Sequence, residues 1–199
     1  MNLLREYIRE LLTEAAMGPA DLPSDAYVVI RVKSMGTAVF YAFADGSMRS
    51  DAGPPSGWVR FSTGGSPTGE CLGANVVVES QSDSGWGPLL YDVAMEESGD
   101  KGLMADRMSL SSEAFNVWKV YMSRGDVQQK QLDTLDNELT PGEDDNCGTD
   151  TALSFDDTFD DYRSDEKKQA LADSPVMKVF TKGPTTIEKL ESMGRLIRK

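Results

Sequence analysis

The stretch best suited to chemistry is a glycine-containing loop, residues 81–87, between an expected strand over residues 74–79 and an expected helix. Pro88 suits the first turn of that helix, because its fixed φ is helical and its missing amide hydrogen has no partner inside the helix. A helix start offers unpaired N–H groups and the positive end of the dipole, and glycines allow a ligand close to the backbone. The arrangement predicts a phosphate-binding site. The structural alternative is an ordinary strand-to-helix connection that binds no ligand.

The same region resembles the acyl-coenzyme A motif of the GNAT acetyltransferase superfamily, in which a Gly-x-Gly follows the fourth strand. The matching residues are Val76-Val77-Val78-Glu79 and Ser82-Asp83-Ser84-Gly85-Trp86-Gly87-Pro88-Leu89-Leu90. A later stretch, Ser111 to Trp118, is similar to the next helix of that superfamily. The run from Gly87 to Asp92, followed by Asp106-Arg107 and by Ser111 to Trp118, also looks like a group of tailed-phage proteins with a GNAT-like core. The resemblance covers residues 74–125.

The resemblance implies acetyl-coenzyme A as the cofactor and assigns roles to particular residues. Glu79 would be the general base, and Tyr121 would protonate the leaving thiolate. The implied cofactor-binding residues are Ser82, Ser84, Gly85, Trp86 and Gly87. The alternatives for the two catalytic candidates are structural: a solvated acid at a strand end and an aromatic residue of the core.

This sequence departs from the family pattern at several points. Ser82 stands where the motif usually has Arg or Gln, and Asp83 places a negative charge where pyrophosphate would lie. Trp118 occupies the place of the usual tyrosine acid, with Tyr121 almost one turn further on. The helices usually found between the first two strands are also missing from the pattern. These departures put both cofactor binding and catalysis in question.

The composition excludes whole classes of chemistry. The 199 residues contain no histidine, which removes Ser-His-Asp and Cys-His catalysis and His-ligated zinc. Two cysteines, Cys71 and Cys147, are too few for a four-thiolate metal site or for a disulfide framework. Cys71 is expected to be a small buried residue, and the acids around Cys147 disfavour a nucleophilic thiolate. No metal is expected.

The net charge of −13 is concentrated in one segment. Residues 132–166 hold 13 acids against one base, Arg163, whereas residues 167–199 hold eight bases against three acids. Repulsion predicts that residues 132–166 are mostly irregular, with the basic tail folding back onto them. Two alternatives are a phosphate mimic that blocks a nucleic-acid-binding protein and a calcium loop. The calcium ligands would be Asp144, Asn146, Gly148 and Asp150.

An amphipathic helix is expected over residues 2–16, where apolar residues recur at helical spacing before Gly18-Pro19. Its apolar stripe would dock on this chain's own core or on another protein. The helix, and Leu12-Thr13-Glu14 in particular, looks like the capsid-targeting peptides of tailed phages, which a head protease cuts after such a triplet. That resemblance implies a capsid or scaffold protein as partner.

The remaining pattern predicts an α+β fold. Four consecutive strands, over residues 27–32, 38–43, 58–61 and 74–79, favour a mainly antiparallel meander. The Gly loop, a helix ended by Gly99, a short apolar link at Leu103-Met104 and a second helix, from Ser111 to Arg124-Gly125, would follow. A strand over residues 176–181 and a final helix with an apolar stripe would complete the chain. The stripe is Ile187, Leu190, Met193 and Leu196.

Four regions result: a helix and linker at 1–25, a GNAT-like domain at 26–131, the acidic segment at 132–166 and the basic tail at 167–199. The leading functional hypothesis is a phage-encoded N-acyltransferase acting on a small-molecule thioester and a basic acceptor. The rival hypothesis is a non-enzymatic internal or accessory virion protein. The expected location is the virion interior or the infected-host cytoplasm. Neither direct nucleic-acid binding nor a membrane span is expected.

Overall fold

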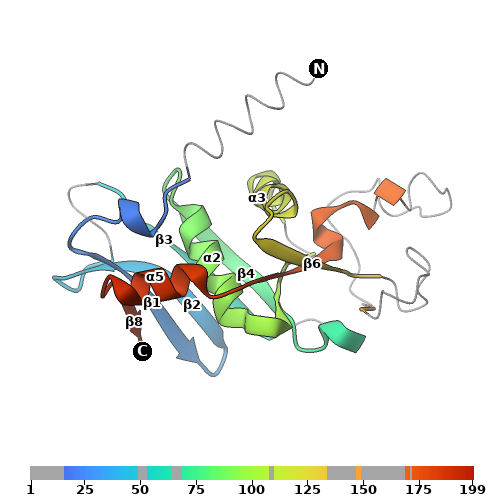
Figure 1. The fold of residues 1–199 in the computed structure, drawn as a ribbon, viewed down its shortest axis with the longest axis horizontal. Helices are drawn as coiled ribbons and strands as arrows, with labels where there is room; N and C mark the ends of the chain where they lie inside the picture. Colours follow the sequence, from blue (N-terminus) through green and yellow to red (C-terminus); the bar gives the residue numbers. More distant parts are fainter. Residues whose placement is uncertain are drawn as a thin grey trace, which may run out of the picture. The chain divides into compact units, whose positions relative to one another are not determined.

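The structure is a computed structural model. It describes residues 16–48, 53–63, 69–107, 110–133, 147–148, 169–170 and 172–199. The described part is α+β, with the meander, glycine turn, helix, short strand and helix in the expected order (Figure 1). The strands are β1 (Ala26–Lys33), β2 (Gly36–Phe43), β3 (Gly57–Thr63), β4 (Asn75–Ser82), β5 (Leu103–Ala105), β6 (Val127–Gln131), β7 (Lys178–Lys182) and β8 (Leu196–Arg198). The α-helices with described bounds are α2 (Gly87–Ser98), α3 (Ser112–Met122) and α5 (Thr185–Ser192).

Within the described residues, the strands form a mixed sheet of eight in the order β6-β7-β5-β4-β3-β2-β1-β8. β1 and β2 are antiparallel, with Ile30 opposite Val39, and β5 and β6 are each antiparallel to β7. β4 and β5 are parallel to each other, and so are β1 and β8. The prediction of a mainly antiparallel α+β protein is therefore confirmed at this level.

The chain divides into two compact units, and the first comprises residues 1–60, 79–94 and 184–199. Its β1–β2 hairpin is rich in β-branched and aromatic residues, and Val29, Ile30 and Tyr41 are almost completely buried. The first half of α2 contributes Leu89, Leu90 and Val93 to this core. The last strand, β8, lies beside β1, the first strand in the sequence (Figure 1). The C-terminal residues therefore belong to the same sheet as β1.

The second unit comprises residues 61–78 and 95–183. The side chain of Ser111 accepts a hydrogen bond from the Ala114 amide at 3.2 Å, which caps α3 at the residue where the sequence predicts its start. The Trp118 ring of α3 stacks on Phe180 of β7, with 5.1 Å between ring centroids. Both rings are fully buried, so α3 and β7 share the core of this unit.

The C-terminal region differs from the prediction. A strand near residues 176–181 is confirmed as β7, but the final helix α5 ends at Ser192. Gly194 adopts a left-handed φ of 66°, which ends the helix as glycine commonly does, and Leu196 then belongs to β8. The prediction that Leu196 continues the helical stripe is wrong. Both β7 and β8 are strands of the sheet, so these parts of the basic tail are ordered sheet elements.

The two cysteines form a disulfide. Cys71 and Cys147 are 76 residues apart in sequence, and their Cα atoms lie 5.1 Å apart. Cys71 is buried, as predicted, but it is half of a cross-link. Next to Cys147, the Asp133 amide donates to the Cys147 carbonyl at 2.7 Å, and Asp133 pairs with Gly148 in a parallel bridge.

Two of the predicted segments fall largely outside the described residues. These are the amphipathic helix over residues 2–16 and most of the acidic segment, including Asp144, Asn146 and Asp150 of the calcium alternative. None of the helices in the described part of the chain is both long and apolar enough to cross a membrane.

Candidate functional site

The candidate site is the turn between β4 and α2, and all of its residues belong to the first unit. β4 ends at Ser82 and α2 begins at Gly87, so the predicted strand, loop and helix are present. Gly85 has a φ of 81°, a conformation that glycine adopts without steric cost. The Trp86 amide donates to the Asp83 carbonyl at 3.1 Å, so this amide is used inside the turn.

Trp86 anchors the turn to the core. Its side chain is buried and packs edge-on against Tyr41, with 5.6 Å between ring centroids and 83° between ring planes. The Tyr41 hydroxyl donates to the Trp86 carbonyl at 2.7 Å, and burial raises the pKa of Tyr41 well above its ordinary value. The Met17 amide also donates to the Gly85 carbonyl at 2.9 Å. The turn is therefore held at its two central residues.

Asp83 is directed at a neighbouring loop. Its carboxylate accepts a hydrogen bond from the Ser56 amide at 2.7 Å, and its own amide donates to the Ser56 carbonyl at 2.9 Å. This double contact fixes the turn against the residues that precede β3. The negative charge that the sequence places beside the turn thus has a structural use in holding Ser56.

The turn nevertheless presents a surface to solvent. Ser82 and Ser84 are exposed and Gly85 and Gly87 are half-exposed, so four of the five predicted cofactor-binding residues are accessible and Trp86 is not. A Cβ atom at Gly87 would lie 2.8 Å from the Ser82 Oγ. Glycine at position 87 therefore leaves room for the Ser82 side chain, which lies against the start of α2.

The two catalytic candidates lie in different units. Glu79 is on β4 in the first unit, where its carboxylate pairs with the Arg60 guanidinium at 3.1 Å and its side chain is 50% exposed. Tyr121 is on α3 in the second unit and is only 1% exposed. Its ring packs against Trp118 and lies under the guanidinium of Arg124, 5.0 Å from ring centroid to Cζ. Both assigned roles stay predictions.

One contact beside the turn escapes sequence reasoning. The Ser80 and Tyr91 hydroxyls lie 2.9 Å apart, which joins β4 to α2 in the first unit. Burial raises the pKa of Tyr91, and the hydrogen bond to Ser80 offsets part of that rise. The sequence gives no signal for this pair, because Tyr91 looks like another residue of the apolar helix.

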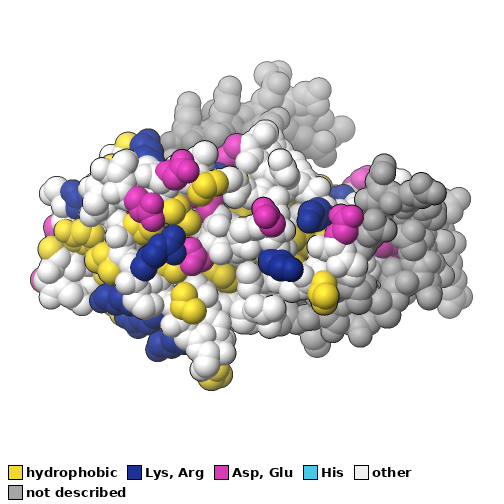
Figure 2. Space-filling model, turned by 60° about the horizontal axis from the view of Figure 1, so that its bottom comes forward, with side chains coloured by type: hydrophobic (Ala, Val, Ile, Leu, Met, Phe, Trp, Pro, Cys, Tyr) yellow, Lys and Arg dark blue, Asp and Glu magenta, His cyan; other side chains and the backbone are white. Residues whose placement is uncertain are grey.

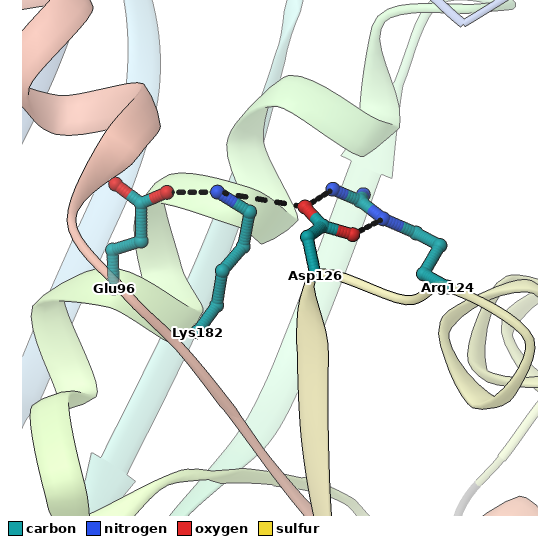
Figure 3. A network of polar contacts seen from close by, with 4 residues as sticks. All are labelled: Glu96, Arg124, Asp126 and Lys182. Carbon is teal, nitrogen blue, oxygen red and sulfur yellow. Dashed lines mark hydrogen bonds and ion pairs between the residues drawn. The ribbon is translucent and has the colours of Figure 1, made fainter.

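A second polar group, in the second unit, also escapes sequence reasoning (Figure 3). The Lys182 ammonium of β7 pairs with the Glu96 carboxylate of α2, and their side chains are 2% and 0% exposed. Asp126 lies 3.9 Å from the same ammonium and accepts two hydrogen bonds from Arg124, at 2.9 and 2.6 Å. Hydrogen bonds from Arg124, together with the positive charges of Arg124 and Lys182, lower the pKa of Asp126.

Among the described residues, no group of three or more metal-ligating side chains comes together. No protein family model, no curated protein and no solved structure shows significant similarity to this chain. The fold and the geometry of the turn must therefore support a functional proposal by themselves.

Proposed function

We propose that the chain binds an acyl-coenzyme A thioester at the turn between β4 and α2 and transfers the acyl group to an amine. The observation that carries the proposal is the solvent exposure of Ser84, Gly85 and Gly87 at the turn that leads into α2. A helix start is electrostatically suited to phosphate groups, and glycines there let the phosphates approach the backbone. The proposed location is the virion interior or the infected-host cytoplasm, and the resemblance to tailed-phage proteins supports it.

The transfer needs a proton acceptor and a proton donor. The amine nitrogen attacks the thioester carbonyl, a C–N bond forms, the C–S bond breaks and the thiolate leaves. Glu79 is half-exposed, so an acceptor amine can reach its carboxylate and give up a proton there. The family resemblance gives Tyr121 the role of proton donor to the thiolate, and this role stays a prediction because the Tyr121 side chain is only 1% exposed. The excess of acids in the sequence favours a basic acceptor.

Calorimetry with acetyl-coenzyme A tests the proposal. Wild-type protein is expected to release binding heat, and Gly87→Glu is expected to abolish it by placing a bulky anion at the helix start. Gly125→Glu is the matched control, because no atom lies within 4 Å of a Cβ there. Circular dichroism must show that all three proteins are folded. Absence of heat from folded wild-type protein at millimolar ligand would refute the proposal.

The second candidate is a non-enzymatic virion protein that uses the fold as a scaffold. It is favoured by the internal engagement of Trp86, whose amide, carbonyl and ring all have partners within the protein. Such a turn can connect β4 to α2 in a fixed geometry without binding a ligand. Residues 2–16 would carry the protein into the capsid. Mass spectrometry of purified particles should then find a copy that begins at Ala15, and absence of the protein from particles would exclude this role.

A further inference from the structure

The Cys71–Cys147 disulfide lies entirely within the second unit. Both cysteines are buried, at 1% and 3% exposure. The surface favours no single kind of partner, because hydrophobic, basic and acidic side chains all occur on the described residues of the face drawn in Figure 2. The disulfide, in contrast, is a group whose chemical state depends on the compartment, since thiols stay reduced in some compartments and become oxidised in others.

Backbone hydrogen bonds hold the chain around Cys71. This cysteine is the last residue of a short 3-10 helix, Gly69–Cys71, and its carbonyl accepts a hydrogen bond from the Ala74 amide at 3.0 Å. The next amide, that of Asn75, donates to the Gly102 carbonyl at 2.9 Å, which ties the start of β4 to the residue before β5. These two bonds do not involve the sulfur, so the chain at Cys71 is expected to keep its geometry when the disulfide breaks.

The chain at Cys147 contacts residues that are more distant in sequence. The Cys147 carbonyl accepts a hydrogen bond from the Asp133 amide at 2.7 Å, and Asp133 pairs with Gly148 in a parallel bridge. The preceding amide, that of Leu132, donates instead to the Met177 carbonyl at 2.7 Å, next to the β6–β7 ladder. The Asp133 amide therefore reports on the position of Cys147, and the Leu132 amide reports on the end of β6.

We propose that the Cys71–Cys147 disulfide is a redox-sensitive clamp, which holds Cys147 against Asp133 when it is formed and releases Cys147 when it is reduced, while the rest of the second unit stays folded. The covalent link to Cys71 keeps the Cys147 carbonyl close to the Asp133 amide. Without the link, noncovalent contacts alone must offset the entropy cost of ordering Cys147.

The redox step is a thiol–disulfide exchange with a dithiol. A thiolate of the dithiol attacks one cysteine sulfur, the S–S bond breaks and the other cysteine leaves as a thiolate. The second thiol of the reagent then displaces the first cysteine, so the protein gains two electrons and two protons and the reagent becomes a disulfide. Because both cysteines are buried, the attack requires a local opening of the fold.

Amide hydrogen exchange of the full-length protein tests the clamp. Excess dithiothreitol reduces the disulfide, and alkylation followed by mass spectrometry verifies that both thiols are free. The Asp133 amide is expected to exchange at least about tenfold faster in the reduced protein, whereas the Ala74 and Leu132 amides keep their rates. Reoxidation by glutathione disulfide should restore the slow rate at Asp133. The Cys71→Ser/Cys147→Ser variant is the matched control, which should exchange like the reduced protein and should not respond to dithiothreitol.

Three results would overturn the proposal. Unchanged exchange at Asp133 after complete reduction would show that noncovalent contacts hold Cys147 without the disulfide. Faster exchange at Ala74 and Leu132 as well would show that the disulfide maintains the whole second unit. A disulfide that dithiothreitol leaves intact in the folded protein would be a permanent cross-link. The test uses no acyl-coenzyme A, so its outcome is independent of the proposed function.

Discussion

Replacing Lys182 with methionine is expected to destabilise the protein strongly, because it removes the cation from a buried ion pair. The Lys182 and Glu96 side chains are almost completely excluded from solvent, at 2% and 0% exposure. The substitution keeps a long apolar side chain in place and so isolates the effect of the charge. The Glu96 carboxylate then stays buried without the ammonium group that now faces it (Figure 3).

The size of the effect follows from this burial. Removing one partner of a buried ion pair typically costs about 3–5 kcal/mol, whereas replacing both partners by apolar residues is often close to neutral. Asp126 is 52% exposed and lies 3.9 Å from the Lys182 ammonium, where the attraction in water-like surroundings is about 1 kcal/mol. Lys182 therefore keeps this weaker partner in the Glu96→Met variant.

Urea unfolding of the two single variants and the double variant measures the coupling. Tryptophan fluorescence is a suitable signal, because Trp118 stacks on Phe180 of the strand that carries Lys182. The Lys182→Met/Glu96→Met variant is expected to be more stable than Lys182→Met alone, with a coupling energy of at least about 2 kcal/mol. Costs that add to within about 0.5 kcal/mol would refute the reasoning, since the two charges would then be energetically independent.

Three further predictions concern the disulfide, the pH dependence and a close backbone approach. Joint replacement of Cys71 and Cys147 by alanine should lower the free energy of unfolding by about 4 kcal/mol in a urea titration, because the cross-link spans 76 residues; a loss under about 1 kcal/mol would contradict this. The lowered pKa of Asp126 stabilises the folded state above the unfolded-state pKa of about 4, and this stability is lost as the pH falls through the folded-state pKa. The free energy of unfolding of Asp126→Asn should therefore fall less than that of wild type between pH 5 and 2. Parallel plots of this free energy against pH would exclude the effect. Gly57→Ala should lower the melting temperature and Gly125→Ala should not, because a Cβ at position 57 would lie 2.6 Å from a backbone oxygen of β4; equal melting temperatures would argue against this close approach.

The sequence predicts elements well where local signals agree. Runs of Val, Ile and aromatic residues define the β1–β2 hairpin, Pro88 and Gly99 bracket α2, and Ser111 caps α3. Each of these signals acts within a few residues, so it can be recognised from one amino-acid sequence. The turn between β4 and α2 belongs to the same class, because its glycines and the strand before it are adjacent in sequence.

Features that depend on distant residues could not be predicted. Ile187, Leu190, Met193 and Leu196 share helical spacing, but Gly194 ends the helix and backbone pairing with β1 makes Leu196 part of a strand. The Cys71–Cys147 disulfide joins positions 76 residues apart, with no local pattern to indicate it.

The polar contacts around the turn and in the second unit follow the same rule. Lys182 looks like an exposed strand residue until Glu96 is known to face it. Similarly, the partners of Trp86 and Asp83 come from β2 and from the residues before β3, so the sequence alone suggests a more open turn than the one observed.

Amide chemical shifts of the full-length protein during a titration with acetyl-coenzyme A test the proposed function most directly. The proposal predicts that the largest shifts occur at Ser84, Gly85 and Gly87, the solvent-exposed residues of the turn that leads into α2. It also predicts little change at Gly125 in the second unit. Unchanged amides at these three residues under millimolar ligand would contradict the account and leave the turn as a structural corner.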